Sequence, residues 1–302
     1  MQRARSGSSV ASMLLLLAFA ASASAATLDQ IRESGALRLG YVAEARPFSY
    51  RDPAGKPAGY AIALCEKVAA AVKANLGLPQ LRTEFVEVGA EDRFDAVKQG
   101  KVDLLCTGGA PTVARRQQVS FSIPVFVGGI GALMREDAPA SVREILEGRP
   151  EPYQPRWRAS LGQVLRDRIF AVVRGTTAAA WVGAKRDEFE IAAKIETVDS
   201  FAAGVERVMA RRADVFFAER AMLLEAAARS PAAGELIVLD RYFTYEAPAL
   251  ALPRGDEDFR LLVDRTLSSL FRSDEIKALY TPYFGKPSEQ ALRFFQASSL
   301  PD

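Results

Sequence analysis

The sequence predicts an α/β protein made of two successive α/β sets, with a cleft between the two domains that they form. Strand patterns alternate with helical patterns over residues 36–106, and a second alternation runs over residues 130–271. Of the 302 residues, 49% are hydrophobic and 25% are charged, which is globular composition and sufficient for two medium-sized domains. Ligand sites in open α/β sheets lie past the carboxyl ends of strands, so the loops that follow strands are the first candidates for function.

The N-terminus reads as a secretory signal peptide covering residues 1–26. Arg3 and Arg5 precede an apolar run at 13–21, and Ala23 and Ala25 follow with the spacing of a cleavage site. A short membrane anchor is the alternative, but the run is too short to span a bilayer comfortably. We therefore expect a mature chain that is located in the periplasm.

Composition also excludes several kinds of chemistry. The chain has no histidine, which removes Ser-His-Asp and Cys-His catalysis and the common histidine-based metal sites. Lys and Arg number 39 and Asp and Glu number 37, so loss of Arg3 and Arg5 leaves the mature chain neutral. A neutral protein is not an obvious partner of nucleic acid. We expect no metal, no cofactor and no nucleic-acid partner, and we expect a monomer.

The first set reads strand, helix, strand, helix, strand, which favours a largely parallel sheet. The longest helix is indicated by apolar residues at Ile62, Cys65, Val68 and Val72, and Gly77 ends it. Turn residues at 52–60 precede this helix. The five elements are expected at 36–42, 61–77, 83–88, 91–100 and 102–106.

The second set repeats this alternation. Its strand and helix patterns fall within 130–136, 141–148, 168–183, 201–229 and 249–271. A stretch at 147–160, which is rich in proline and arginine and contains Trp157, interrupts the set. It is either an exposed variable loop or a surface for a partner. The C-terminal part is expected to be helical, and the tail at 286–302 suggests no role.

Cys65 lies in the long helical pattern, and Cys106 ends a strand pattern. The chain has two cysteines, and an exported protein can keep a disulfide. The alternative is that both are small buried apolar residues. A bridge would tie the helix to the sheet and stabilise the fold by roughly 2–4 kcal/mol.

The loop after the strand at 102–106 suggests an anion site. Gly108 and Ala110 allow a close approach, and Thr112 is a suitable N-cap for a helix that begins at Val113. Arg115 would lie in the first turn, where a cation is unfavourable unless an anion binds there. A small carboxylate held by Arg115 satisfies this arrangement. The alternative is that Arg115 and its neighbour are solvated surface charges.

A similar arrangement follows the strand pattern that ends at Val173. Gly175, Thr176 and Thr177 lead directly into a helical pattern. Hydroxyl and N–H groups therefore converge at the N-terminus of a second helix. An ordinary capped helix explains this loop alone, but two such loops from two halves of one chain suggest a shared ligand.

Together these segments resemble the family-3 extracellular solute-binding proteins, the substrate-binding components of polar amino-acid ABC transporters. The stretches "LRLGYVAEARPFSYRD", "TVARRQQVSFSIPV", "VVRGTTAAAWV" and "ADVFFAERAMLL" carry the resemblance in the family's order. It covers nearly all of the mature chain and implies a type II periplasmic-binding-protein fold. That fold has two α/β lobes joined by two crossing hinge strands, which we expect near 121–126 and 241–245. Lobe 1 would comprise 27–125 plus 246–302, and lobe 2 would comprise 126–245.

The resemblance also implies ligand-binding residues. Arg115 matches the arginine that holds the ligand α-carboxylate, and Thr176 and Thr177 match the loop that supports it. Glu219 stands where the family usually has an aspartate for the α-ammonium. Arg93 matches an arginine of glutamate/aspartate-type members, although a solvated helix charge is the alternative.

Three further positions belong to this implied site. Phe48 matches an aromatic cleft residue, with core packing as the alternative. Gly108 and Ala110 stand where the family usually has a small polar and a hydroxyl residue. An arginine after the first strand of acidic-amino-acid binders is replaced by Val42, and Arg46 is shifted. Because lost hydrogen bonds cost roughly 1–3 kcal/mol each, we expect weaker binding of a standard amino acid.

The resemblance implies a binding protein that closes on a small amino acid or related carboxylate and delivers it to an ABC transporter permease. Two alternatives remain open. A few relatives with this fold are dehydratases of small cyclic acids, and Glu219 would then be the candidate acid. The second alternative is an orphan periplasmic sensor that uses the 147–160 stretch as a surface for its partner.

Overall fold

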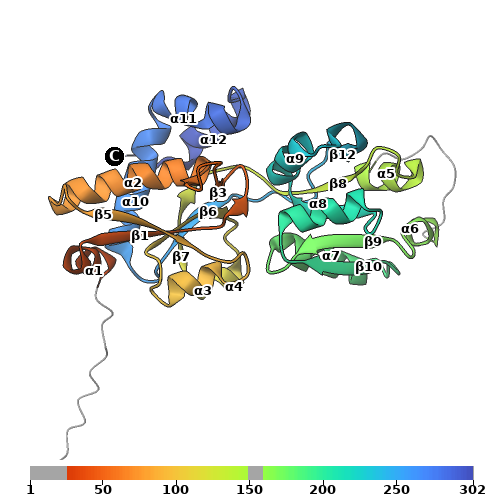
Figure 1. The fold of residues 1–302 in the computed structure, drawn as a ribbon, viewed down its shortest axis with the longest axis horizontal. Coiled ribbons are helices and arrows are strands. Elements are labelled where there is room, and N and C mark those ends of the chain that lie inside the picture. The colour runs from red at the N-terminus through yellow and green to blue at the C-terminus, as the bar shows by residue number, and fades with distance from the viewer. Residues whose placement is uncertain (1–25, 149–158, 302) are drawn as a thin grey trace, which may run out of the picture.

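The computed structural model describes residues 26–148 and 159–301, and it consists of two α/β bodies joined side by side by two segments (Figure 1). The predicted two-part α/β fold is therefore confirmed. Residues 1–25 of the predicted signal peptide and residues 149–158 of the 147–160 stretch lie outside the described residues. No helix in the described ranges is long and apolar enough to cross a membrane.

The first body is built on a five-stranded sheet in the order β5-β1-β6-β13-β7. β1 pairs in parallel with β5 and β6, whereas β13 runs antiparallel to both β6 and β7. Its strands are β1 (Ala36–Tyr41), β5 (Arg82–Glu87), β6 (Leu104–Gly109), β7 (Ser120–Pro124) and β13 (Ala249–Leu252). β13 returns to this sheet after the chain has built the whole second body.

Helices cover both faces of this sheet, and a small sheet flanks it (Figure 1). The helices are α1 (Thr27–Ser34), α2 (Tyr60–Leu76), α3 (Arg93–Lys98), α4 (Val113–Arg116), α10 (Glu257–Phe271), α11 (Glu275–Phe284) and α12 (Glu289–Ser298). The small sheet consists of β2 (Glu44–Ala45), β3 (Ser49–Arg51) and β4 (Pro57–Ala58). Apolar side chains of α2, α10 and the sheet pack into one core in which Leu37, Leu64 and Phe259 are fully buried.

The second body has a five-stranded sheet in the order β10-β9-β11-β8-β12. Its strands are β8 (Ile130–Arg135), β9 (Ile169–Val173), β10 (Lys194–Val198), β11 (Val215–Glu219) and β12 (Leu236–Val238). Its helices are α5 (Ala140–Glu147), α6 (Ala159–Val164), α7 (Thr177–Glu188), α8 (Phe201–Met209) and α9 (Arg220–Arg229), followed by a 3₁₀ turn at Ala233–Glu235. β8 is antiparallel to β11 and β12, so both sheets are mixed rather than nearly all parallel.

The C-terminal tail, for which the sequence suggested no role, forms α12 and closes the first core. Phe295 of α12 is 1% exposed. Its ring lies 5.0 Å from that of Phe271 and 5.8 Å from that of Tyr280. Burial of an aromatic side chain of this size stabilises a fold by about 1.5–3 kcal/mol, so α12 is an integral part of the first body.

The two connecting segments pair where they cross between the bodies. Gly128 and Glu246 form an antiparallel bridge with hydrogen bonds of 3.0 Å and 2.9 Å in the two directions. The crossings were expected near 121–126 and 241–245, so the pairing lies one or two residues after each predicted segment. The first segment crosses later because β7 pairs with β13 in the first sheet before it leaves the first body. The lobe boundaries at 125/126 and 245/246 stay a prediction.

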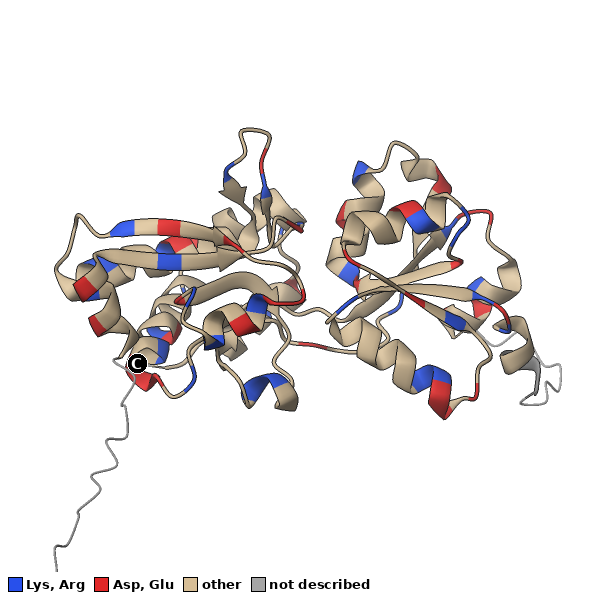
Figure 2. Ribbon diagram, turned by 60° about the horizontal axis from the view of Figure 1, so that its bottom comes forward, with Lys and Arg blue, Asp and Glu red and all other residues tan. Residues whose placement is uncertain are grey.

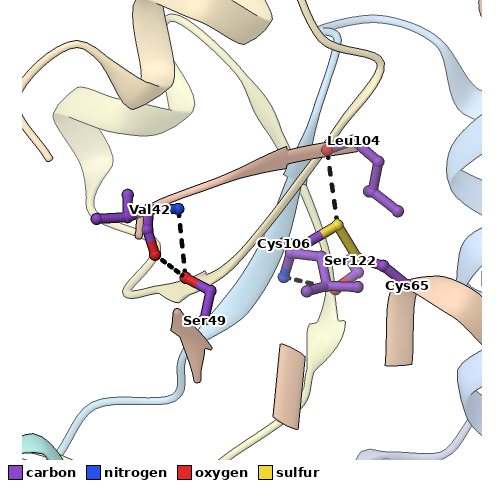
Figure 3. Close-up of a disulfide and its surroundings, with 7 residues drawn as sticks. Val42, Ser49, Cys65, Leu104, Cys106 and Ser122 are labelled. Atoms are coloured by element: carbon purple, nitrogen blue, oxygen red, sulfur yellow. Dashed lines mark hydrogen bonds between the residues drawn. A yellow bond between two sulfur atoms is a disulfide. The ribbon is translucent and has the colours of Figure 1, made fainter. Parts of the chain in front are cut away.

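The predicted disulfide between Cys65 and Cys106 is confirmed. It joins the middle of α2 to β6, as Figure 3 shows, with the two Cα atoms 6.1 Å apart. Both cysteines are fully buried in the first core. The bridge anchors β6 two residues before Gly108, the first residue that was predicted to approach an anion.

Removing this bridge is expected to destabilise the protein without changing its fold. In the double variant Cys65→Ala/Cys106→Ala, the free energy of unfolding should fall by roughly 2–4 kcal/mol, because the closed loop of 41 residues no longer restricts the unfolded chain. Urea unfolding followed by circular dichroism measures the change. Equal stabilities of the oxidised wild type and the double variant would contradict this role.

Acidic and basic residues are interspersed over both bodies (Figure 2). Pairs such as Arg38 with Asp103 and Arg168 with Asp214 fix strand ends locally. Segments of both signs are scattered along the ribbon, in keeping with the nearly balanced numbers of acidic and basic residues.

Candidate functional site

A cavity of about 90 Å³ lies between the two bodies and is lined by residues of both. All eight residues that the sequence proposed for ligand binding lie on its wall. They are Phe48, Arg93, Gly108, Ala110, Arg115, Thr176, Thr177 and Glu219. The bodies touch at its rim, where the Arg174 Nε of the second body lies 3.6 Å from the Glu91 Oε2 of the first.

Arg115 is positioned by the short helix α4. As predicted, Thr112 caps this helix, and its hydroxyl accepts a hydrogen bond of 3.2 Å from the Arg115 N–H. The Arg115 guanidinium donates to the Ala110 carbonyl at 2.8 Å and, across the cavity, to the Gly175 carbonyl at 3.1 Å. Burial lowers the pKa of Arg115, and the nearby Glu246 opposes this effect. Arg116, by contrast, is exposed.

Arg93 is buried rather than solvated, with 8% of its surface exposed. It begins α3, and its guanidinium approaches the Gly175 carbonyl at 3.5 Å, the outer limit of a hydrogen bond. Burial, and to a lesser extent the charge of Arg115, lowers its pKa to about 9. The guanidinium carbons of both arginines lie 4.7 Å from the centre of the Phe94 ring. Two cations therefore converge on one aromatic side chain at one end of the cavity.

The loop before α7 supplies hydrogen-bonding groups from the second body. Gly175 has a φ of +70°, a backbone conformation that favours glycine, and its carbonyl faces both guanidinia. The Thr176 hydroxyl caps α7 by accepting from the Ala179 N–H at 3.2 Å. The first N–H groups of a helix have no partner within it, so the α7 N-terminus offers donors to an anion.

Glu219 ends β11 and lies toward the segments that cross between the bodies. Its two carboxylate oxygens accept from the Gly129 N–H at 2.8 Å and the Ala221 N–H at 3.1 Å. Burial raises its pKa from 4.5 to about 7; the two N–H groups lower it, and the charge of Glu246 raises it slightly. No cation of the described residues lies within ion-pair distance of Glu219.

This buried carboxyl makes the stability of the protein depend on pH. Its pKa is higher in the folded state, so its stabilising contribution is complete below pH 4.5 and is lost as the pH rises through about 7. Relative to Glu219→Gln, the wild type should lose up to about 3 kcal/mol between pH 5 and pH 8. Urea unfolding of both proteins at the two pH values measures this, and a difference that is independent of pH would contradict it.

The remaining predicted positions form the floor of the cavity. Phe48 is 2% exposed and packs its ring 5.0 Å from Phe126, so it belongs to the core and to the cavity wall at once. A Cβ at Gly108 would lie 3.2 Å from the Phe48 ring, so a side chain there would require the ring to shift by a few tenths of an ångström. Arg46 does not line the cavity, and its guanidinium stacks 3.3 Å over the Tyr50 ring.

The wall also contains residues that the sequence analysis missed, among them Thr107, Phe201 and Glu246. Thr107 directly precedes Gly108, so the neighbouring motif already marked its position. Phe201 begins α8 and packs against the first core from the second body. Glu246 carried no local signal, because only the crossing of two distant segments brings it to the cavity.

Comparison with known proteins places these features in one family. The sequence model of the bacterial extracellular solute-binding proteins, family 3, matches residues 37–286. The L-glutamate/L-aspartate-binding protein of Pseudomonas aeruginosa is 26% identical over 86% of this chain and 80% of its own length. The cyclohexadienyl dehydratase of that organism is 32% identical, over 38% of this chain and 40% of its own length.

Solved structures agree with this comparison. An ancestral amino acid-binding protein, described as a precursor of cyclohexadienyl dehydratase, superimposes with a TM-score of 0.69 and 25% identity. The match covers 86% of this chain and 100% of that one. The family match and this neighbour confirm the two-lobed fold that the sequence motifs indicated.

Proposed function

The chain belongs to the bacterial extracellular solute-binding proteins, family 3, and we propose that it captures a dicarboxylic amino acid for uptake. The ligand binds in the cavity between the two bodies, and an ABC transporter permease receives it. Relatives that bind glutamate and aspartate support this ligand class. The charges of the cavity support it independently.

The pair Arg93 and Arg115 is the observation that carries the proposal. Neither guanidinium makes an ion pair within the described parts of the chain, although both face one cavity and burial disfavours their charge. A buried charge without a partner is costly, and two like charges together are more so. In the structure they share the Gly175 carbonyl, which carries only a partial charge. A ligand with two carboxylates gives each guanidinium a full counter-charge.

Another part of the cavity wall carries the opposite sign. Glu219 lies there without a cationic partner among the described residues and matches the family position for the α-ammonium. L-Glutamate and L-aspartate carry two carboxylates and one ammonium group, so each charge of the ligand can meet an opposite charge on the cavity wall. A basic amino acid would place a second cation near Arg93 and is therefore disfavoured.

In this proposal, residues 1–26 are a signal peptide that directs export. The mature protein is a monomer in the periplasm. Residues 27–125 and 246–302 form lobe 1, and residues 126–245 form lobe 2. The bodies open and close about the crossing at Gly128 and Glu246. The permease recognises the closed form, so ligand binding energy is used to stabilise closure.

A thermal-shift panel on the mature chain tests this function. We expect L-glutamate and L-aspartate to raise the melting temperature, and L-glutamine, L-arginine and glycine to raise it less or not at all. A ligand at a hundred times its Kd stabilises by about 2.7 kcal/mol, which is readily detected. The largest shift with a neutral or basic amino acid would exclude the dicarboxylic class.

A dehydratase on the same scaffold is the second candidate function. Glu219 favours it, because an acid whose pKa is about 7 can donate a proton at neutral pH. The similarity to a cyclohexadienyl dehydratase supports it further. Incubation of the mature chain with prephenate separates the candidates: turnover that is lost in Glu219→Gln establishes the enzyme, and stable prephenate excludes this reaction.

A further inference from the structure

Glu246 lies on the cavity wall although no sequence motif marked it. Its backbone is fixed at the crossing by the paired hydrogen bonds to Gly128. Its carboxylate faces the same cavity as Glu219 and is close enough to affect the pKa values of Glu219 and Arg115. The site therefore contains two carboxylates where the sequence predicted one.

Only hydroxyl groups hold the Glu246 carboxylate. Its oxygens accept from the Thr177 hydroxyl at 3.1 Å and from the Thr244 hydroxyl at 3.2 Å. No lysine or arginine of the described residues lies within ion-pair distance of it. Hydroxyl donors orient a carboxylate without neutralising it, and each carboxylate oxygen can accept a further hydrogen bond.

The Thr107 hydroxyl provides independent evidence that a ligand atom binds in this cavity. Thr107 lies near the end of β6, lines the same cavity and is 7% exposed. Its hydroxyl is fully buried and has no hydrogen-bond partner among the described residues. Buried hydroxyl groups are normally hydrogen-bonded, so one that faces a ligand cavity without a partner indicates a ligand atom.

We propose that Glu246 and Thr107 complete, together with Glu219, an acceptor site for a primary ammonium group of the ligand. An ammonium has three N–H donors and no acceptor, which matches two carboxylates and one hydroxyl. The mutual repulsion of the two carboxylates is relieved when the cation binds between them. This inference rests on the proposed function and makes Glu246 and Thr107 determinants of ligand specificity.

Two variants, Glu246→Gln and Thr107→Val, test the site in the mature chain with L-glutamate as the probe. By isothermal titration, we expect Glu246→Gln to weaken binding by about 10- to 100-fold and Thr107→Val by about 3- to 10-fold. Thr107→Ser should restore wild-type affinity because it restores the hydroxyl. Glu33→Gln removes an exposed carboxylate of α1 and serves as the matched control, with unchanged affinity.

The melting temperatures of the empty proteins separate this role from a structural one. Glu246→Gln relieves the repulsion with Glu219 but removes a charge that favours the Arg115 cation, and these two effects oppose each other. Thr107→Val removes a buried hydroxyl without a partner among the described residues, so we expect neither variant to lower the melting temperature. Weaker binding together with a lower melting temperature would make Glu246 a purely structural residue and overturn the inference. So would a Glu246→Gln affinity equal to that of Glu33→Gln. Failure of the wild type to bind any amino acid would instead overturn the proposed function.

Discussion

Replacing Arg115 by alanine is expected to weaken L-glutamate binding by roughly 100- to 1,000-fold, the largest effect that we expect from one side chain of the site. The ligand carboxylate would remain buried in the closed cavity with no cation opposite it. Isothermal titration of the purified variant measures this loss. Arg93→Gln should weaken L-glutamate more than it weakens L-glutamine, because only L-glutamate has a second carboxylate for Arg93.

The neighbouring residue provides a matched control for this prediction. Arg116 is exposed and does not line the cavity, so Arg116→Ala should bind L-glutamate within about twofold of the wild type. The empty Arg115→Ala protein should keep its melting temperature, since the charge of Arg115 disfavours that of Arg93. Equal losses of affinity in both variants would show that general positive charge, and not a clamp, holds the ligand.

Replacing Gly129 by alanine is expected to reduce both stability and ligand binding. A Cβ at Gly129 would lie 1.9 Å from the Thr244 carbonyl oxygen, so the two crossing segments must separate. Gly129 also donates to the Glu219 carboxylate at 2.8 Å and accepts from the Arg220 N–H at 2.9 Å. We expect the free energy of unfolding to fall by about 3 kcal/mol or more, and ligand affinity to fall with it.

A second glycine shows what the same substitution does without a clash. Gly183 lies within α7, and no atom lies within 4 Å of a Cβ placed there. Gly183→Ala should stabilise the protein by up to about 1 kcal/mol and leave ligand affinity unchanged. Urea unfolding and L-glutamate titration of both variants provide the comparison. A Gly129→Ala protein as stable as the wild type would show that the crossing tolerates separation.

Local sequence signals predicted most of the fold. The helical spacing from Ile62 to Val72 and the closing Gly77 located α2, and Thr112 was identified correctly as a helix cap. The direction of β8 and β13 was not predictable in this way. Both strands run antiparallel to their neighbours because the chain crosses between the bodies and returns, and such a path leaves no periodic pattern in the sequence.

In the candidate site, too, local patterns predicted some residues, whereas residues placed by long-range contacts were not predicted. Arg115 and Thr176 were recognisable because each lies in a strand–loop–helix pattern that brings donors to a strand end. The burial of Arg93 was not recognisable, since its neighbours on α3 read as an ordinary short surface helix. Glu246 reaches the cavity only through its pairing with Gly128, a contact between residues that are far apart in the chain.

A crystal structure of the mature protein grown with L-glutamate tests the central claim most directly. We predict one L-glutamate in the cavity between the bodies, with its carboxylates on Arg115 and Arg93 and its ammonium at Glu219. An empty cavity at saturating L-glutamate, or a ligand bound with its ammonium toward the two arginines, would contradict this account.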